Sequence, residues 1–168
     1  MTKILEPMMG EIEREAAITR RLLERVPESK LAWKPHPKSM TLGQLAMHVA
    51  SIPGNISKLA QLQEFDAGAA NFDPPDPAGA KEILLTLENS VKDAQSFLCG
   101  STDAAALGDW CLKANGKEVF TIPRVELLRT IMLNHWYHHR GQLSVYLRLL
   151  DVPVPVIYGR SADENPFA

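Results

Sequence analysis

The chain has 168 residues, of which 45% are hydrophobic and 23% are charged, and its formal net charge at pH 7 is −2. This length and composition are typical of one soluble globular domain, which we expect to span residues 1–168. The small negative charge excludes the basic field that drives binding to nucleic acid. The sequence shows neither a signal peptide nor a membrane-spanning run, so we expect a cytoplasmic protein without a membrane partner.

The first part of the chain predicts a helix followed by an ordered loop. Apolar residues recur at helical spacing from about residue 5 to Val26, and Pro27 ends the pattern. The stretch PESKLAWKPHPKS follows, in which three prolines exclude regular structure. We expect Trp33 in this loop to fold back on the core and His36 to be a loop residue.

The middle of the chain predicts two more helices joined by a long connection. Thr41 followed by Gln44 is a capping box, which starts the second helix, and Pro53 with Gly54 bends this helix or ends it early. The stretch EFDAGAANFDPPDPAGA, residues 64–80, has few apolar anchors and reads as an exposed crossover. Helical periodicity resumes from Lys81 to Phe97.

The last third predicts a small hairpin and the longest helix. Asn115-Gly116 lies between two short runs and suits a type I′ turn. Pro123 then opens a periodic segment that reaches about Leu150, and a tail with alternating valine and proline, residues 151–168, is expected to be extended. The fold class is therefore all-α, a four-helix bundle with a small β-hairpin between helices three and four.

Three histidines are expected to meet inside this bundle. His135 and His139 stand four residues apart, so both imidazoles project from one face of the last helix, within reach of a shared metal ion. His48 is the one polar residue in the apolar row of the second helix. A buried imidazole without a partner costs about 1 to 3 kcal/mol, so one metal ion satisfies all three, or each finds a carbonyl or hydroxyl instead.

Other polar residues have weaker claims to a site. Gln142 lies on the histidine face and could bond a water, a substrate or a neighbouring helix, whereas His138 lies on a different face. Arg140 either forms a salt bridge with an acid such as Glu126 or Asp151, the interpretation we favour, or orients an anionic substrate.

The remaining candidates are the cysteines and two tryptophans. Cys99 and Cys111 are expected to be free thiols, and a nucleophilic role for Cys111 would need a neighbouring base. Trp110 and Trp136 are expected in the core or at an interface. The sequence lacks a Gly-rich phosphate loop, HExxH, GxSxG and CxxC, which removes the usual support for phosphoryl transfer, zincin proteolysis, serine hydrolysis and dithiol chemistry.

Three segments together resemble the DinB family of DinB/YfiT-like metalloenzymes. They are TLGQLAMHVA, LNHWYHHRGQLSVYLRLL and VPVPVIYGRSADE, and the HxxxHRGQL motif is their most specific part. The resemblance implies a four-helix bundle, a homodimer, and a metal bound by His48, His135 and His139. An apolar surface near Trp136 and the Val-Pro tail is a further candidate for the dimer contact.

The resemblance also suggests chemistry, because relatives in the wider superfamily use low-molecular-weight thiols. Three imidazoles leave a zinc-like ion with an open position for a thiol or a water. Availability favours zinc, and nickel also suits the ligands. We therefore expect a small-molecule substrate and hypothesise a metal-dependent thiol transferase; a metal-dependent hydrolase and a non-catalytic stress-related metal-binding protein are the alternatives.

Overall fold

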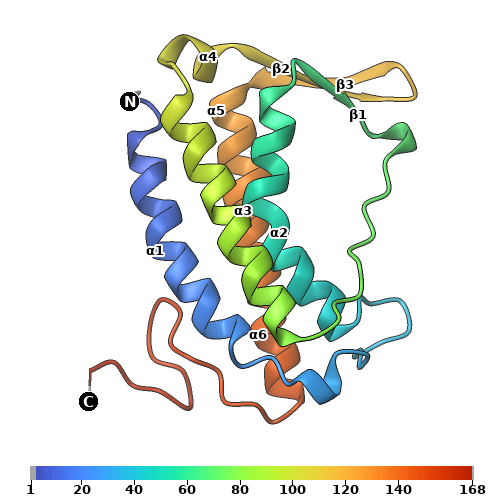
Figure 1. Cartoon of the computed structure of the whole chain (residues 1–168), viewed down its shortest axis with the longest axis vertical. Coiled ribbons are helices and arrows are strands. Elements are labelled where there is room, and N and C mark those ends of the chain that lie inside the picture. Colours follow the sequence, from blue (N-terminus) through green and yellow to red (C-terminus); the bar gives the residue numbers. More distant parts are fainter. Residues whose placement is uncertain (1–2, 168) are drawn as a thin grey trace.

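Figure 1 shows the computed structural model, which describes residues 3–167, as a bundle of four helical rods. The rods are α1 (Glu6–Leu23), α2 (Leu42–Gln61), α3 (Ala80–Gly100), and a composite of α5 (Arg124–Leu127), the π-helical segment η3 (Leu128–Asn134) and α6 (His135–Leu149). Short helical turns lie in the connections, namely η1 (Glu28–Lys30), η2 (Ala67–Ala69) and α4 (Asp103–Leu107). The predicted four-helix bundle is confirmed. Within residues 3–167, no helix is long and apolar enough to cross a membrane.

The predicted start of the second helix is also confirmed in detail. The backbone N–H of Gln44 donates to Thr41 Oγ1 at 3.1 Å, and the Thr41 N–H donates to Gln44 Oε1 at 3.0 Å. These two bonds satisfy backbone donors that the first helical turn leaves unpaired. The ends of the other helices lie within a few residues of the expected positions, with α1 ending at Leu23 instead of Val26.

A small sheet covers one end of the bundle, at the top of Figure 1. The predicted hairpin is formed by β2 (Asp109–Ala114) and β3 (Lys117–Pro123), and both turn residues have positive φ, 52° at Asn115 and 76° at Gly116. The crossover was expected to lack regular structure, but its first residues form β1 (Glu64–Asp66), which pairs in parallel with β2. Three residues are too few for a strand period to be visible in the sequence.

The crossover is fastened to the hairpin turn by one carboxylate. Asp66 accepts hydrogen bonds from the backbone N–H groups of Gly68, Asn115 and Gly116 at 2.7 to 2.9 Å. These bonds hold the pKa of Asp66 below its usual value, so the carboxylate stays ionised. The rest of the crossover then runs along the outside of α2 toward the other end of the bundle (Figure 1).

Pro53 lies inside α2 without ending it, contrary to one of the two outcomes expected from the sequence. The helix continues to Gln61, and the N–H of Gly54 donates to Ser90 Oγ on α3 at 2.7 Å. A Cβ atom at position 54 would stand 2.9 Å from Ser90 Cα, so glycine is needed for α2 and α3 to pack this closely. Pro53 has no N–H, and the carbonyl of Val49 therefore lacks the donor that a regular helix supplies four residues later.

Trp136 fills the position that Pro53 leaves open. Its indole Nε1–H donates to the Val49 carbonyl at 2.9 Å, and the side chain is fully buried. Trp136 is therefore a core residue and supplies no surface for a dimer contact. This bond joins α6 to α2 at the residues next to His135 and His48, and so it sets the height at which the two helices face each other.

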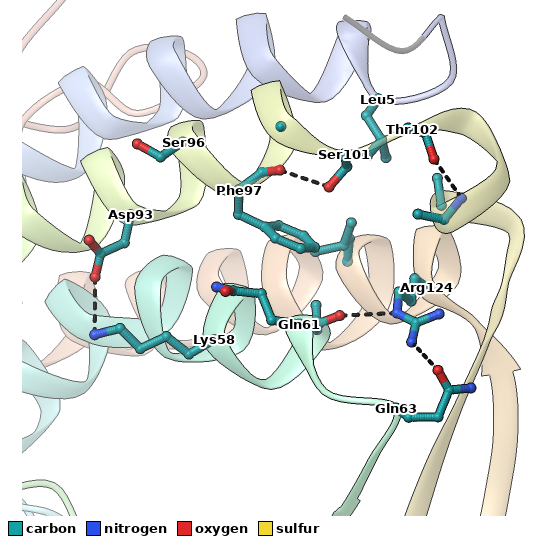
Figure 2. A pocket seen from close by; sticks show the side chains of 15 residues that line it. Leu5, Lys58, Gln61, Gln63, Asp93, Ser96, Phe97, Ser101, Thr102 and Arg124 are labelled. Atoms are coloured by element: carbon teal, nitrogen blue, oxygen red, sulfur yellow. Dashed lines mark hydrogen bonds and ion pairs between the residues drawn. The ribbon is translucent and has the colours of Figure 1, made fainter.

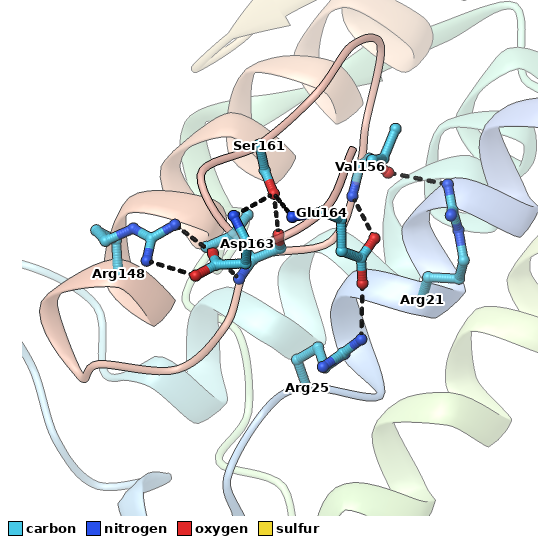
Figure 3. Close-up of polar contacts among 8 residues, drawn as sticks. Arg21, Arg25, Arg148, Val156, Ser161, Asp163 and Glu164 are labelled. Atoms are coloured by element: carbon cyan, nitrogen blue, oxygen red, sulfur yellow. Dashed lines mark hydrogen bonds and ion pairs between the residues drawn. The ribbon is translucent and has the colours of Figure 1, made fainter. Parts of the chain in front are cut away.

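The C-terminal tail is extended, as expected, and polar contacts hold it against the bundle (Figure 3). Asp163 pairs with Arg148, and Glu164 pairs with Arg25 of the loop after α1 at 2.9 Å. Ser161 Oγ donates to the Val154 carbonyl at 2.7 Å and accepts from the backbone N–H groups of residues 163 and 164. The tail thereby covers the end of the bundle opposite the sheet.

We predict that Trp136→Phe lowers the free energy of unfolding by about 1 to 3 kcal/mol, because it leaves the buried Val49 carbonyl without a donor. Urea denaturation measures this loss. In a Pro53→Ala background the new backbone N–H at position 53 can donate to the Val49 carbonyl. Trp136→Phe should therefore lower the free energy of unfolding by less in that background.

Trp110→Phe is the matched control for this experiment. The indole of Trp110 donates to the Leu59 carbonyl at 3.0 Å, and that carbonyl also accepts from the Leu62 backbone N–H. Its loss should therefore cost less than the loss of the Trp136 bond. Equal costs of Trp136→Phe with and without Pro53 would contradict the role given to this proline.

Candidate metal centre

His48 of α2 and His135 and His139 of α6 come together in the bundle as the sequence predicts. One ring nitrogen from each residue lies within 4.8 Å of the other two, and the Nε2 atoms of His48 and His135 are 3.2 Å apart. All three side chains are half-buried. The spacing of four residues on α6 supplies two of the rings, and the Trp136 contact with Val49 brings the third ring opposite them.

Two of the rings are oriented by hydrogen bonds at the nitrogen that faces away from the cluster. His135 Nδ1 lies 3.3 Å from the Ile131 carbonyl, and His139 Nδ1 lies 2.8 Å from Gln142 Oε1. Both partners are carbonyl oxygens, which only accept, so Nδ1 carries the proton in each ring. The Nε2 lone pairs are then free for a metal ion.

A π-helical segment immediately precedes His135, where the sequence predicts one continuous helix from Pro123 to about Leu150. At the end of η3 the backbone N–H of His135 donates to the Met132 carbonyl. The carbonyl of Ile131, one residue earlier, accepts from the imidazole ring of His135. The irregular turn thus provides the acceptor that orients a candidate ligand, a common use of π turns at functional sites.

Burial keeps the cluster neutral. Desolvation, together with the smaller effects of the neighbouring rings of His139 and His135, lowers the pKa of His48 to about 4. Desolvation also lowers the pKa of His135 and of His139. Neutral imidazole is the form that binds a metal ion, so these ligands need not lose protons at neutral pH.

The three donor atoms are compatible with a divalent ion, and one pair of them can be compared with zinc geometry. Zinc binds imidazole nitrogen at about 2.0 to 2.1 Å with tetrahedral angles, which places two ligand nitrogens about 3.3 Å apart. The distance of 3.2 Å between Nε2 of His48 and Nε2 of His135 agrees with this geometry. Three imidazoles leave one tetrahedral position for another molecule, as in catalytic sites.

Gln142 lies beside the cluster and connects two histidines. Its Oε1 accepts from His139, and its Nε2 lies 3.0 Å from Nε2 of His138. Gln142 therefore contacts a candidate ligand and positions its ring. His138 lies on the other side of Gln142 and contacts the Gln142 amide. Neither arrangement could be predicted from helical faces alone, since the side chain of Gln142 reaches back across a turn.

Arg140 forms the salt bridge that the sequence favours, but its partner is Glu15 and not Glu126 or Asp151. The guanidinium is 1% exposed and lies 2.6 Å from a carboxylate oxygen of Glu15. It also donates to Thr19 Oγ1 at 3.2 Å and to the hydroxyl of Tyr158 in the tail. These contacts tie α6 to α1 and to the tail. A partner more than a hundred residues away has no signature in the sequence.

An apolar cavity of about 500 Å³ opens onto His48 and His135. Its walls come from α2, from the crossover, from the sheet and from the end of α5 and η3. Sequence reasoning missed this cavity, because the crossover residues that close it show no periodic pattern.

A larger hollow of about 900 Å³ lies elsewhere, between the ends of α2 and α3 and the start of α5, and none of the three histidines lines it (Figure 2). Its charged groups already have partners: Lys58 pairs with Asp93 at 3.0 Å, and Arg124 donates to Gln63 and to the Ala60 carbonyl. We therefore place the candidate site at the histidines.

Comparison with known proteins identifies a family and agrees with the four-helix fold. The model of the DinB family matches residues 1–165. The uncharacterized protein YrdA of Bacillus subtilis (strain 168) is 27% identical over 98% of this chain and 93% of its own length. The crystal structure of a DinB-like protein from Bacillus cereus ATCC 10987 has a TM-score of 0.71 at 23% identity and covers 92% of this chain and 97% of that one. The DinB-like protein YjoA of Bacillus subtilis has a TM-score of 0.68 at 15% identity, covering 93% and 100%.

We predict that the metal-free protein loses stability as the pH falls from about 6.5 toward 4. In the unfolded chain His48 has an ordinary pKa of 6.5, whereas burial lowers it to about 4 in the folded chain. Between these values the unfolded state binds more protons, so the free energy of unfolding falls with falling pH. Melting temperatures near pH 7 and near pH 5 measure this effect.

The variant His48→Gln should show a smaller decrease over the same range. His36→Gln is the matched control, because His36 lies in an exposed loop, and it should follow the unmodified protein. Equal decreases in all three proteins would contradict the assignment of this pH dependence to His48.

Proposed function

Because the chain belongs to the DinB family, we propose that it is a metal-dependent enzyme in which His48, His135 and His139 hold one divalent ion, zinc in the first place. We further propose that it transfers a low-molecular-weight thiol to an electrophilic substrate. The observation that carries the proposal is the convergence of three neutral imidazoles, two of them with Nδ1 engaged by carbonyl oxygens, at the end of an apolar cavity.

The residues around the cluster have defined tasks in this proposal. A divalent ion held there lowers the pKa of a thiol or a water that binds beside it. Ile131 and Gln142 fix the orientation of His135 and His139. Trp136 holds α6 against α2, so that the three rings keep their separation. The apolar wall formed by residues such as Ile52 and Ile56 excludes water from the same space.

The apolar cavity beside the cluster suits a thiol that carries an organic group, whereas the three imidazoles would support activation of a thiol or of a water. Metalloproteases of the HExxH type add a carboxylate as general base for the attacking water. Among the described residues that line the cavity, Asp73 is the one acid, and it belongs to the crossover. A thiol would need no such base, because a divalent ion held by the three histidines would lower its pKa.

The thiol is supplied from solution in this proposal. Cys111 lies between Trp110 and Leu112, which both line the cavity, so alternation along β2 directs the Cys111 side chain to the other face of the sheet. Cys99 is exposed on α3. In the addition, the thiol loses its S–H proton, sulfur bonds to an electrophilic carbon, and the neighbouring carbon takes up a proton, so no oxidant is required.

We predict about one equivalent of divalent metal per chain in protein purified without a tag or a nickel column, measured by mass spectrometry. His135→Ala should lose this metal because two imidazoles bind zinc far more weakly than three. His36→Ala, which removes an exposed loop histidine, should keep it. Absence of metal from the unmodified protein even after incubation with excess zinc would contradict the metal site.

The metal-loaded protein should also accelerate the reaction of N-acetylcysteine with phenyl vinyl ketone, a neutral electrophile, followed by loss of free thiol. The rate should fall at least about tenfold in His48→Ala, since three ligands are needed to hold the ion. Equal rates in the two proteins would contradict thiol transfer. Turnover of an ester without any thiol would replace this proposal by hydrolysis.

A further inference from the structure

We propose that the substrate that meets the thiol is an uncharged, largely apolar molecule with an aromatic or similarly flat group. It would bind in the cavity between α2, the crossover and the sheet, with its reacting atom toward His48 and His135. This inference rests on the proposed function and names the substrate class of the same site. It is argued from the walls of the cavity and not from the cluster itself.

The cavity has the size and the chemistry of a small-molecule site. Its volume of about 500 Å³ lies within the range of about 300 to 1,000 Å³ found for ligand pockets. Four aromatic residues line it, namely Phe65, Phe72, Trp110 and Phe120. Such rings contact flat apolar ligands over a large area.

The polar tip of Trp110 is turned away from the ligand. Its indole N–H donates to the Leu59 carbonyl, so the ring offers the cavity an apolar surface and no free donor. The centroid of the Phe120 ring lies 6.4 Å from that of Trp110. Strands β2 and β3 therefore build one apolar wall from rings that already pack on each other.

The charges in the cavity argue against an anionic substrate. Among the residues that line it, all within the described part of the chain, no lysine or arginine occurs, and Asp73 carries a negative charge. An anionic group held among these walls, away from the metal ligands, would therefore have no cationic side chain as a partner, and burying an unpaired charge is unfavourable. Arg140, the cation next to His139 in sequence, is already paired with Glu15 on the other side of α6.

The crossover forms the outer wall and the entrance. Phe72 is 63% exposed and meets Phe65 edge to face, with 6.4 Å between ring centroids. The start of this segment is fastened to the hairpin turn by Asp66, which keeps the wall in place. An exposed aromatic ring at the rim is well placed to contact an entering apolar molecule.

Two fluorescent probes that differ in charge test the inference. N-phenylnaphthylamine is neutral, and anilinonaphthalene sulfonate has nearly the same rings with one negative charge. We expect metal-free protein to bind the neutral probe at one site per chain and the sulfonate at least about tenfold more weakly, as the uncompensated charge requires. Equal affinities for the two probes would overturn the inference.

Substitutions locate the bound probe. Phe72→Ala should weaken binding of the neutral probe about threefold to tenfold, the effect of losing one aromatic contact. Phe167→Ala, which removes an even more exposed phenylalanine from the tail, should leave it unchanged. A loss of the same size in both variants would place the probe outside the cavity and overturn the inference.

A further variant should reverse the preference for the neutral probe over the sulfonate, a result that simple loss of folding cannot produce. Ile131→Lys introduces a cation at a cavity residue that is 38% exposed, and it should strengthen binding of the sulfonate while weakening the neutral probe. Leu149→Lys, at an exposed site of α6 outside the cavity, should change neither. An unchanged preference in Ile131→Lys would contradict the location.

The result is independent of the metal site. The probes are titrated into metal-free protein, so a failure to bind metal leaves the cavity test intact. Conversely, loss of probe selectivity would leave the metal content and the thiol reaction as they are. The two proposals can therefore fail separately.

Discussion

The candidate site depends on one hydrogen bond in the bundle core, between the indole of Trp136 and the carbonyl of Val49. Pro53 makes this bond the replacement for a missing one, because its ring nitrogen cannot donate to Val49 as the next turn of a regular helix would. A proline inside a helix usually weakens it, but here the free carbonyl becomes the point at which α6 is attached. His48 and His135 are the neighbours in sequence of the two bonded residues, so the same contact sets the distance between their rings.

The π-helical segment solves a related problem on the other helix. A histidine that ligates a metal through Nε2 needs an acceptor for its Nδ1–H, and a regular helix has its carbonyls engaged by backbone N–H groups. At the end of η3 the N–H of His135 donates to the Met132 carbonyl, and the Ile131 carbonyl is the acceptor for the His135 ring. His139, one turn later in regular helix, takes its acceptor from the side chain of Gln142 instead.

Much of this arrangement could be predicted from the sequence because it rests on local signals. The capping box at Thr41, the Asn115-Gly116 turn and the four-residue spacing of His135 and His139 each encode their own geometry. His48 could be added because a lone histidine in an apolar row must face inward.

What could not be predicted depends on contacts between distant residues. The strand β1 exists only because β2 offers it an edge, and the π segment has no periodic signature. The pairing of Arg140 with Glu15 joins residues from opposite ends of the chain. The apolar cavity likewise forms only where the crossover, the sheet and α2 meet, and none of these segments has a sequence pattern that predicts the cavity by itself.

The two faces of α6 carry different groups, and this explains how one helix both packs in the bundle and contributes to the candidate site. Tyr137 and Arg140 face α1, where Glu11 and Glu15 accept their hydrogen bonds. His135 and His139 face α2, and the described lining of the cavity that opens onto His48 and His135 contains no lysine or arginine. A cation beside the imidazoles would oppose the binding of a divalent ion, whereas a neutralised pair on the far face does not. Within residues 138–140, the sequence HHR therefore contains both a ligand of the candidate metal site, His139, and the cation that joins α6 to α1, Arg140.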